Sequence, residues 1–203
     1  MDVPRDIREG EEFSLYELKK YLSENNISAE NLSLKQFPSG YSNLTYFLQS
    51  SSKQFVLRRP PFGAKSLQGG HDMLREYNVL KNLKSQFSKV PDVFLYCDNN
   101  EILGAPFFLM ERVEGYIIRP NLQQKDSPGS DIIQNVSKSL VSTLVELHNV
   151  NIEKANLKDL GNINGYVKRQ VEGWIKRYNH SKTDNISNMD FISSWLYENQ
   201  PSE

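Results

Sequence analysis

The sequence predicts an α+β protein in which an antiparallel sheet comes first and helices follow. Residues 36–61 alternate between strand-like apolar runs and small-residue turns, and Pro60 and Pro61 end the last run. After residue 116 the apolar positions recur instead with the 3.6-residue period of helices. We therefore predict two lobes, residues 1–115 and residues 116–203.

Composition narrows the class of protein. The chain has 203 residues, of which 38% are hydrophobic and 24% charged, which is enough for a buried core. A net charge of −1 gives no general attraction to nucleic acid or to anionic membranes. No apolar run approaches the roughly 18 residues of a membrane span. Cys97 is the only cysteine, and the three histidines lie apart without ligand spacing, so we expect a cytoplasmic protein without a metal site.

The sequence of the amino-terminal region predicts a mobile acidic leader followed by one helix. Residues 1–12 are acidic and polar, and we expect them to be mobile. Ser14 and Glu17 have the spacing of a capping box, which begins a helix after Ser14. The Asn25–Asn26 pair is the expected end of that helix.

The turn between the first two strands of residues 36–61 has the composition of a phosphate-binding loop. Small and polar residues let the backbone turn tightly with its N–H groups outward, and here they are Ser39, Gly40, Ser42 and Asn43, with Tyr41 between them in the loop. The apolar run Phe55–Leu57 then delivers Arg58 at a strand end. Protein-kinase-like folds hold nucleotide phosphates with such a hairpin and cation. A purely structural hairpin is the alternative interpretation of this segment.

Glu76 has an unusual place on the helix predicted for residues 71–86. It falls in the middle of an apolar face formed by Met73, Tyr77, Val79, Leu80 and Leu83. A carboxylate there needs a partner, because burying an unpaired charge costs several kcal/mol. Arg58 is the best partner available, and a glutamate that reaches solvent at the edge of the face is the alternative.

Two further strands and a polar connector follow. Val93–Cys97 is predicted as a strand, with a turn at residues 98–100 and a second strand in the apolar run Ile102–Met110. That run passes directly into the polar segment Glu111–Gly115, whose backbone groups would lie free beside an apolar wall. An adenine ring can use both features, although a simple exit loop fits as well. The order of loop, cation, carboxylate and connector matches that of kinases.

Three helices are predicted beyond residue 116. Ser130 and Asp131 are expected to cap the first, which runs to about Leu147. The second covers residues 165–180 and the third residues 188–198.

Several blocks resemble the aminoglycoside phosphotransferase family. These blocks are FPSGYSNLTYFLQ, FVLRRPP, REYNVLKNL, PFFLMERVEG, LHNVNIEKANLKDLG and GYVKRQVEGWIKRYNHS. They are most similar to the branch in which a kinase-like domain is fused to an acyl-CoA dehydrogenase, and the similarity runs from about Leu32 to the C-terminus. The resemblance implies a two-lobed, protein-kinase-like fold that binds ATP between an antiparallel-sheet lobe and a helical lobe, the latter incomplete here.

The resemblance also implies roles for individual residues. Residues 39–43 would form the nucleotide loop. Arg58 would replace the usual lysine at the α- and β-phosphates, holding them as a fork, with Glu76 as its helix partner. The adenine pocket would be formed by the side chain of Met110, the carbonyl of Glu111 and the amide of Val113.

The catalytic part of the family pattern is missing from this sequence. A His-Gly-Asp loop and a magnesium-binding aspartate should follow the helix that ends near Tyr197, yet no His-Gly-Asp triplet occurs. We therefore expect no catalytic residue in this chain, magnesium ligands only beyond Glu203, and no phosphoryl transfer by this chain alone. Apolar surface left for further helices would favour a homodimer.

The predicted function is that of an ATP-dependent phosphotransferase acting on a hydroxyl group of a small molecule. The branch implies a hydroxyacyl thioester as acceptor, and the candidates on the acceptor side are Arg169, Trp174 and Tyr178, although core packing would equally explain the two aromatic residues. A non-catalytic nucleotide-binding or protein-interaction module is the main rival. A structural domain without a ligand is the third hypothesis, and stabilisation by ATP would separate it from the other two.

Overall fold

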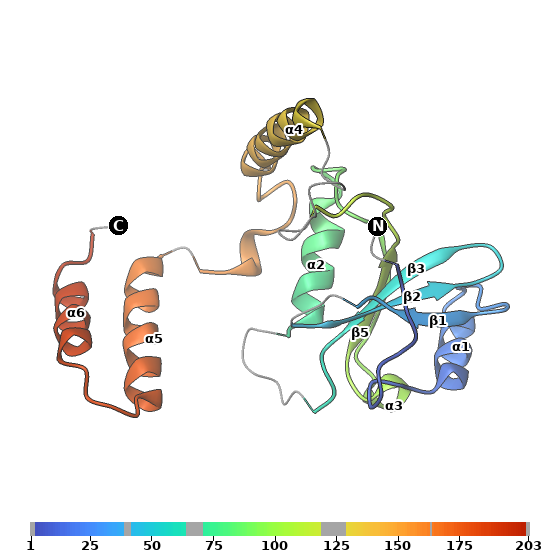
Figure 1. Ribbon diagram of the computed structural model, residues 1–203, viewed down its shortest axis with the longest axis horizontal. Coiled ribbons are helices and arrows are strands. Elements are labelled where there is room, and N and C mark those ends of the chain that lie inside the picture. The colour runs from blue at the N-terminus through green and yellow to red at the C-terminus, as the bar shows by residue number, and fades with distance from the viewer. Residues whose placement is uncertain (1–2, 39–41, 64–70, 119–128, 163, 202–203) are drawn as a thin grey trace. The chain divides into compact units, whose positions relative to one another are not determined.

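The computed structural model describes residues 3–38, 42–63, 71–118, 129–162 and 164–201 (Figure 1). It divides into two compact units, Met1–Leu157 and Lys158–Glu203. The last strand ends at Glu111 and the next long helix begins at Ser130, so strands do give way to helices in the predicted region. The lobe boundary at residue 116 stays a prediction.

The first unit is built on a five-stranded antiparallel sheet, which confirms the α+β class. Its strands are β1 (Ser33–Gln36), β2 (Leu44–Gln49), β3 (Gln54–Arg59), β4 (Val93–Cys97) and β5 (Phe107–Glu111). They lie in the order β1-β2-β3-β5-β4, with every neighbouring pair antiparallel. Consequently β5, which leads into the connector, lies directly beside β3, which carries Arg58.

Helices cover both faces of this sheet, as Figure 1 shows. One face packs on α1 (Leu15–Glu24) and α3 (Asn100–Leu103), where the ring of Tyr21 lies edge-on to that of Phe107. On the other face α2 (Met73–Leu83) places Tyr77 against the rings of Tyr96 and Phe108. Side chains alternate between the two faces along each strand, so the face of a residue follows from its position.

The amino-terminal segment is not the mobile leader predicted from its composition. Arg5 and Gln36 exchange two backbone hydrogen bonds of 2.8 Å, and the Arg8 amide donates to the buried Gln36 side chain. Gln36 in turn donates to the carboxylate of Glu11, and the hydroxyl of Tyr46 donates to the Glu11 carbonyl at 2.7 Å. A buried amide needs hydrogen-bond partners, and this segment supplies them.

Helix boundaries correct two further predictions. Residues 100–103 form the short helix α3 rather than the start of a strand, because Asn99 caps it and Gly104 ends it at φ 75°. The strand therefore begins only at Phe107. Ser14 is confirmed as the N-cap of α1, since its Oγ accepts from the Glu17 amide at 3.3 Å. At α4 the N-cap residue is Gly129, without a side-chain cap.

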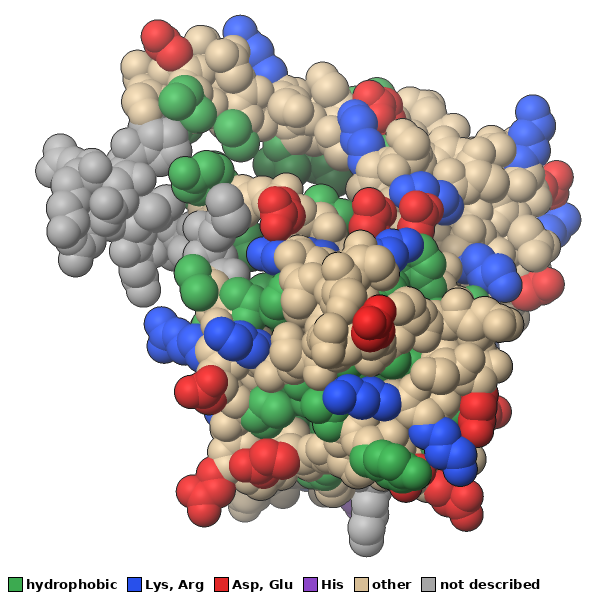
Figure 2. Space-filling model, turned by 90° about the vertical axis from the view of Figure 1, so that its right-hand side faces the viewer, with side chains coloured by type: hydrophobic (Ala, Val, Ile, Leu, Met, Phe, Trp, Pro, Cys, Tyr) green, Lys and Arg blue, Asp and Glu red, His purple; other side chains and the backbone are tan. Residues whose placement is uncertain are grey.

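The remaining helices have nearly the predicted ranges. They are α4 (Ser130–His148) in the first unit, and α5 (Tyr166–Ser181) and α6 (Ser187–Glu198) in the second, which also holds a 3-10 turn at Lys158–Leu160. Among the described residues, no helix is long and apolar enough to cross a membrane. On the face drawn in Figure 2, acidic and basic side chains are interspersed, in keeping with a net charge of −1.

Candidate functional site

The predicted pair between Arg58 and Glu76 is present in the structure. Strand β3 delivers Arg58 on the face covered by α2, and Asp72 begins α2 by accepting a hydrogen bond from the Arg75 amide at 2.9 Å. Glu76 then lies in the first turn, with its Oε2 atom 2.9 Å from Arg58 Nε. The two side chains are 32% and 34% exposed, although the contacting atoms themselves are shielded from solvent. The pair is therefore partly buried, rather than fully buried as the apolar face suggested.

The end of the predicted nucleotide loop lies close to this pair. Ser39, Gly40 and Tyr41 fall outside the described residues, whereas Ser42 is exposed and Asn43 is buried. Asn43 Oδ1 lies 2.7 Å from His71 Nδ1, which ties the start of β2 to the residues before α2. Asn43 and Glu76 both line a cavity of about 290 Å³, together with Val79 and Leu80.

A second cavity lies beside the connector. It has a volume of about 280 Å³ and is lined by Phe37, Val56 and residues 112–117. Val56 is two residues before Arg58 on β3, so both side chains are on the same face of the sheet. The cavity is thus reached from the face that carries the cation.

Sequence reasoning missed Phe37 and Val56 as walls of this cavity. Their signal was present but weak: Phe37 is two residues before the nucleotide loop, and Val56 has the same strand parity as Arg58. Met110, the predicted wall, lies opposite Val56 in the β3–β5 register and therefore on the same face.

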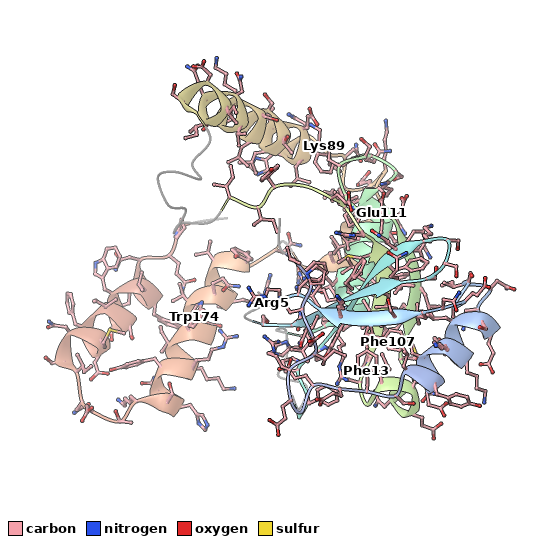
Figure 3. All side chains as sticks on the ribbon, turned by 45° about the vertical axis from the view of Figure 1, so that its right-hand side comes forward. Arg5, Phe13, Lys89, Phe107, Glu111 and Trp174 are labelled. Atoms are coloured by element: carbon pink, nitrogen blue, oxygen red, sulfur yellow. The ribbon has the colours of Figure 1, made fainter. Side chains whose placement is uncertain are left out.

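The connector residues Glu111 and Val113 differ in their contacts. The Glu111 amide donates to the Asp92 carbonyl at 2.7 Å, and its carboxylate accepts from the Asp92 amide at 3.0 Å. Glu111, labelled in Figure 3, is thereby tied to the start of β4. Val113 is 69% exposed and lines the cavity. Their predicted contacts with adenine remain predictions.

The neighbouring Arg59 has a different, structural role. Its side chain is on the opposite face of β3 and is buried, donating to the carbonyls of Leu103 at 2.7 Å and Pro60 at 3.1 Å. Burial lowers the pKa of Arg59. Of these two adjacent cations, Arg58 is therefore the one on the cavity side.

The acceptor-side candidates belong to helix α5 of the second unit. The Arg169 guanidinium donates to the carbonyls of Asn162 and Asn164, so it stabilises the turn before the helix. Trp174 is exposed, and the guanidinium carbon of Arg177 lies 4.9 Å from the centroid of the Trp174 ring. Tyr178 lies one turn further along the same helix. Among the described residues, no three His, Cys, Asp or Glu side chains form a group that could hold a metal ion.

The antiparallel sheet, the β3–α2 ion pair and the cavity beside the connector define a kinase-like protein. A solved structure of a Ralstonia eutropha JMP134 protein, assigned as an aminoglycoside phosphotransferase, has a TM-score of 0.72 and 26% identity to this chain. The similarity covers 95% of this chain and 55% of that one. The chain belongs to the APH phosphotransferase enzyme family, whose model matches residues 33–203 and confirms the resemblance found in the sequence.

Its relatives are longer proteins named for a second enzyme. Acyl-CoA dehydrogenase family member 11 of Rattus norvegicus is 38% identical over 209 residues, covering 99% of this chain and 26% of that protein. The Homo sapiens protein of the same name is 36% identical, covering 84% of this chain and 21% of that protein. Acyl-CoA dehydrogenase family member 10 of Mus musculus is 32% identical, covering 88% of this chain and 17% of that protein. This chain thus spans about a quarter or less of each of these relatives.

Proposed function

We propose that this chain forms the ATP-binding part of a phosphotransferase that moves the γ-phosphoryl group of ATP to a hydroxyl group of a small molecule. The observation that carries the proposal is the Arg58–Glu76 pair, on the same sheet face as the wall of the connector cavity. A cation fixed at a strand end by a helix carboxylate is the arrangement with which kinases hold phosphates. Its place on the same sheet face as the cavity wall supports a nucleotide rather than a free phosphate ion.

The described residues fit the two halves of ATP. Adenine is flat and apolar with polar edges, and Phe37 and Val56 offer apolar walls beside the connector backbone. The guanidinium of Arg58 is always charged and can hold two phosphate oxygens at once. Residues 39–43 complete the phosphate side of the proposed site. Bound ATP would supply the phosphoryl group, while Arg58, held by Glu76, would bind the α- and β-phosphates.

The proposal also covers the acceptor, the metal ion and the location of the protein. The relatives are named for acyl-CoA dehydrogenation, and on that basis we propose a hydroxyacyl thioester as the acceptor. Trp174 and Tyr178 would contact it with Arg169 bracing the turn, and the exposure of Trp174 favours contact over core packing. Among the described residues no three His, Cys, Asp or Glu side chains form a group that could hold a metal ion, and we assign magnesium no ligand here. A cytoplasmic location belongs to the same proposal.

Calorimetric titration with ATP and with adenosine tests the proposal. We expect the chain to bind ATP, and Arg58→Ala to weaken ATP binding by roughly tenfold or more while adenosine binding changes little. Lys20→Ala, which removes a cation from α1 on the other face of the sheet, is the matched control and should bind ATP as the wild type does. Absence of ATP binding would overturn the proposal in favour of an interaction module. Equal affinity in Arg58→Ala would overturn the role of the Arg58–Glu76 pair, on which the proposal rests.

A further inference from the structure

Arg112 is the second residue of the connector Glu111–Gly115, and its side chain folds back over the sheet. The side chain is 18% exposed, although it belongs to a polar segment that leaves the sheet. Its guanidinium carbon lies 4.6 Å from the ring centroid of Phe47 on β2. Nη1 donates to Gln54 Oε1 on β3 and also lies 3.2 Å from Glu114 Oε1. One side chain thus connects two strands and the connector.

The partners of Arg112 are themselves held in place. Gln54 Nε2 donates to Gln49 Oε1 at 2.6 Å, so the amide that receives the guanidinium has a fixed orientation. The ring of Phe47 lies edge-on to that of Phe37, with centroids 6.3 Å apart. We call Phe47, Gln54, Arg112 and Glu114 the Arg112 cluster. Through Arg112 and Glu114 this cluster forms part of the wall of the connector cavity, to which Phe37 also belongs.

The connector is therefore anchored at two successive residues. Glu111 is tied to Asp92 on the β4 side, and Arg112 is tied to β2 and β3. The next residue, Val113, lies in the cavity wall. Backbone groups can recognise the edge of a base only if their spacing is fixed before the ligand arrives, because ordering a flexible segment lowers affinity.

We propose that Arg112 is a positioning residue that holds the connector in the conformation that distinguishes one purine base from another. This inference rests on the proposed nucleotide site and deepens it. Arginine is required because its planar group can stack on Phe47 and form directed hydrogen bonds at the same time, whereas lysine offers a point charge. The cluster acts on the base, and Arg58 acts on the phosphates.

The test compares ATP, GTP and tripolyphosphate as ligands of the full chain. Arg112→Ala is expected to lower the ratio of ATP to GTP affinity by roughly tenfold and to change tripolyphosphate affinity by less than about twofold. Arg112→Lys should resemble the alanine variant, because it loses the stack and the fork. Lys20→Ala, which removes a cation from α1 on the opposite face of the sheet, should keep the wild-type ratio.

The outcomes separate the two proposals. A wild-type chain that binds neither ATP nor tripolyphosphate overturns the nucleotide site, and the role of Arg112 falls with it. A wild-type chain that binds ATP, with an unchanged base ratio in Arg112→Ala, overturns the role of Arg112 alone. An equal loss for all three ligands indicates general structural damage and also overturns it. If Arg112→Ala does not fold, Phe47→Leu removes the stack and should still lower the base ratio.

Discussion

The sheet region and the helices α4, α5 and α6 differ in how far their apolar residues are buried. Around the sheet, Tyr46, Leu57 and Phe107 are 0% exposed. The three helices have equally clear apolar stripes, yet none of their residues is buried. Leu140 of α4 is 60% exposed. The contacts of α4 within its unit include exposed polar ones, such as Lys89 to Glu146 at 2.6 Å.

This difference shows which parts of the proposed site rest on a closed core. The sheet packs on α1 and α3 on one face and on α2 on the other. Arg58, Glu76 and the connector therefore belong to packed elements. An amphipathic helix gains most of its stability from packing its apolar face, and the described residues do not cover α4–α6. The roles proposed for Trp174 and Tyr178 therefore depend on a surface that is still open.

The largest test of this comparison is a pair of truncations. Phe107→Ala empties a fully buried site between the sheet and α1 and should lower the free energy of unfolding by about 3–5 kcal/mol. Leu140→Ala removes an exposed apolar side chain from α4 and should change the free energy of unfolding by less than about 0.5 kcal/mol. Urea titration followed by circular dichroism measures both. Equal losses would show that α4 is packed as tightly as the sheet.

The second test concerns the buried cation of the sheet region. Arg59→Met fills much of the same volume but leaves the carbonyls of Leu103 and Pro60 without their donor, so it should cost about 2 kcal/mol of unfolding free energy. Arg177→Met, which removes a cation from the face of Trp174 in the helical region, should cost less than about 0.5 kcal/mol. The same urea titration applies. A gain in stability for Arg59→Met would mean that burying the charge costs more than its hydrogen bonds return.

Residues with a strong local signal were predicted well from the sequence. Glu76 lies in the middle of an apolar face, which indicated a partner, and Arg58 at the end of the preceding strand was the best one available. The N-cap at Ser14 and the ranges of α4–α6 follow from short-range patterns in the same way. What these features share is that their cause lies within a few turns of chain or in one neighbouring strand.

Features that depend on distant residues were not predicted. The segment before Ser14 was taken as mobile because its composition is polar, yet its partner Gln36 is buried some 25 residues later. One local signal was missed as well: the apolar run from Ile102 was read as one strand, although Asn99 begins a short helix and Gly104 ends it before β5. The cluster around Arg112 joins β2, β3 and the connector, and no sequence pattern within any one of these segments predicts it.

The third prediction concerns the ion pair on α2, the helix packed on the cavity side of the sheet. Glu76→Ala should lower the free energy of unfolding by about 1–2 kcal/mol, between the effects known for exposed and for buried pairs. The fully buried pair expected from the sequence would have cost more, but both side chains are about one-third exposed. Glu146→Ala, which breaks an exposed pair on α4, is the control. A double-mutant cycle with Arg58→Ala measures the coupling, and independent effects would contradict the pairing.

The smallest expected effect is a pH dependence at the amino-terminal segment. Burial opposes ionisation of Glu11, but hydrogen bonds from Gln36 and Arg8 outweigh it and hold its pKa below the ordinary value of 4.5. The unfolded chain therefore binds this proton more tightly than the folded chain does. Glu11 contributes stability above pH 4.5, and this contribution is lost as the pH falls through the lower pKa of the folded state.

Urea titrations between pH 7 and pH 3 would measure this contribution. Glu11→Gln should flatten the acid side of the stability profile, and Gln36→Ala should flatten it as well, because it removes one of the hydrogen bonds that lower the pKa. The double variant should be no flatter than Glu11→Gln, since no titrating carboxylate remains at that position. An unchanged acid slope in Glu11→Gln would mean that the segment is held to β1 by its backbone bonds to Gln36, without a contribution from the carboxylate.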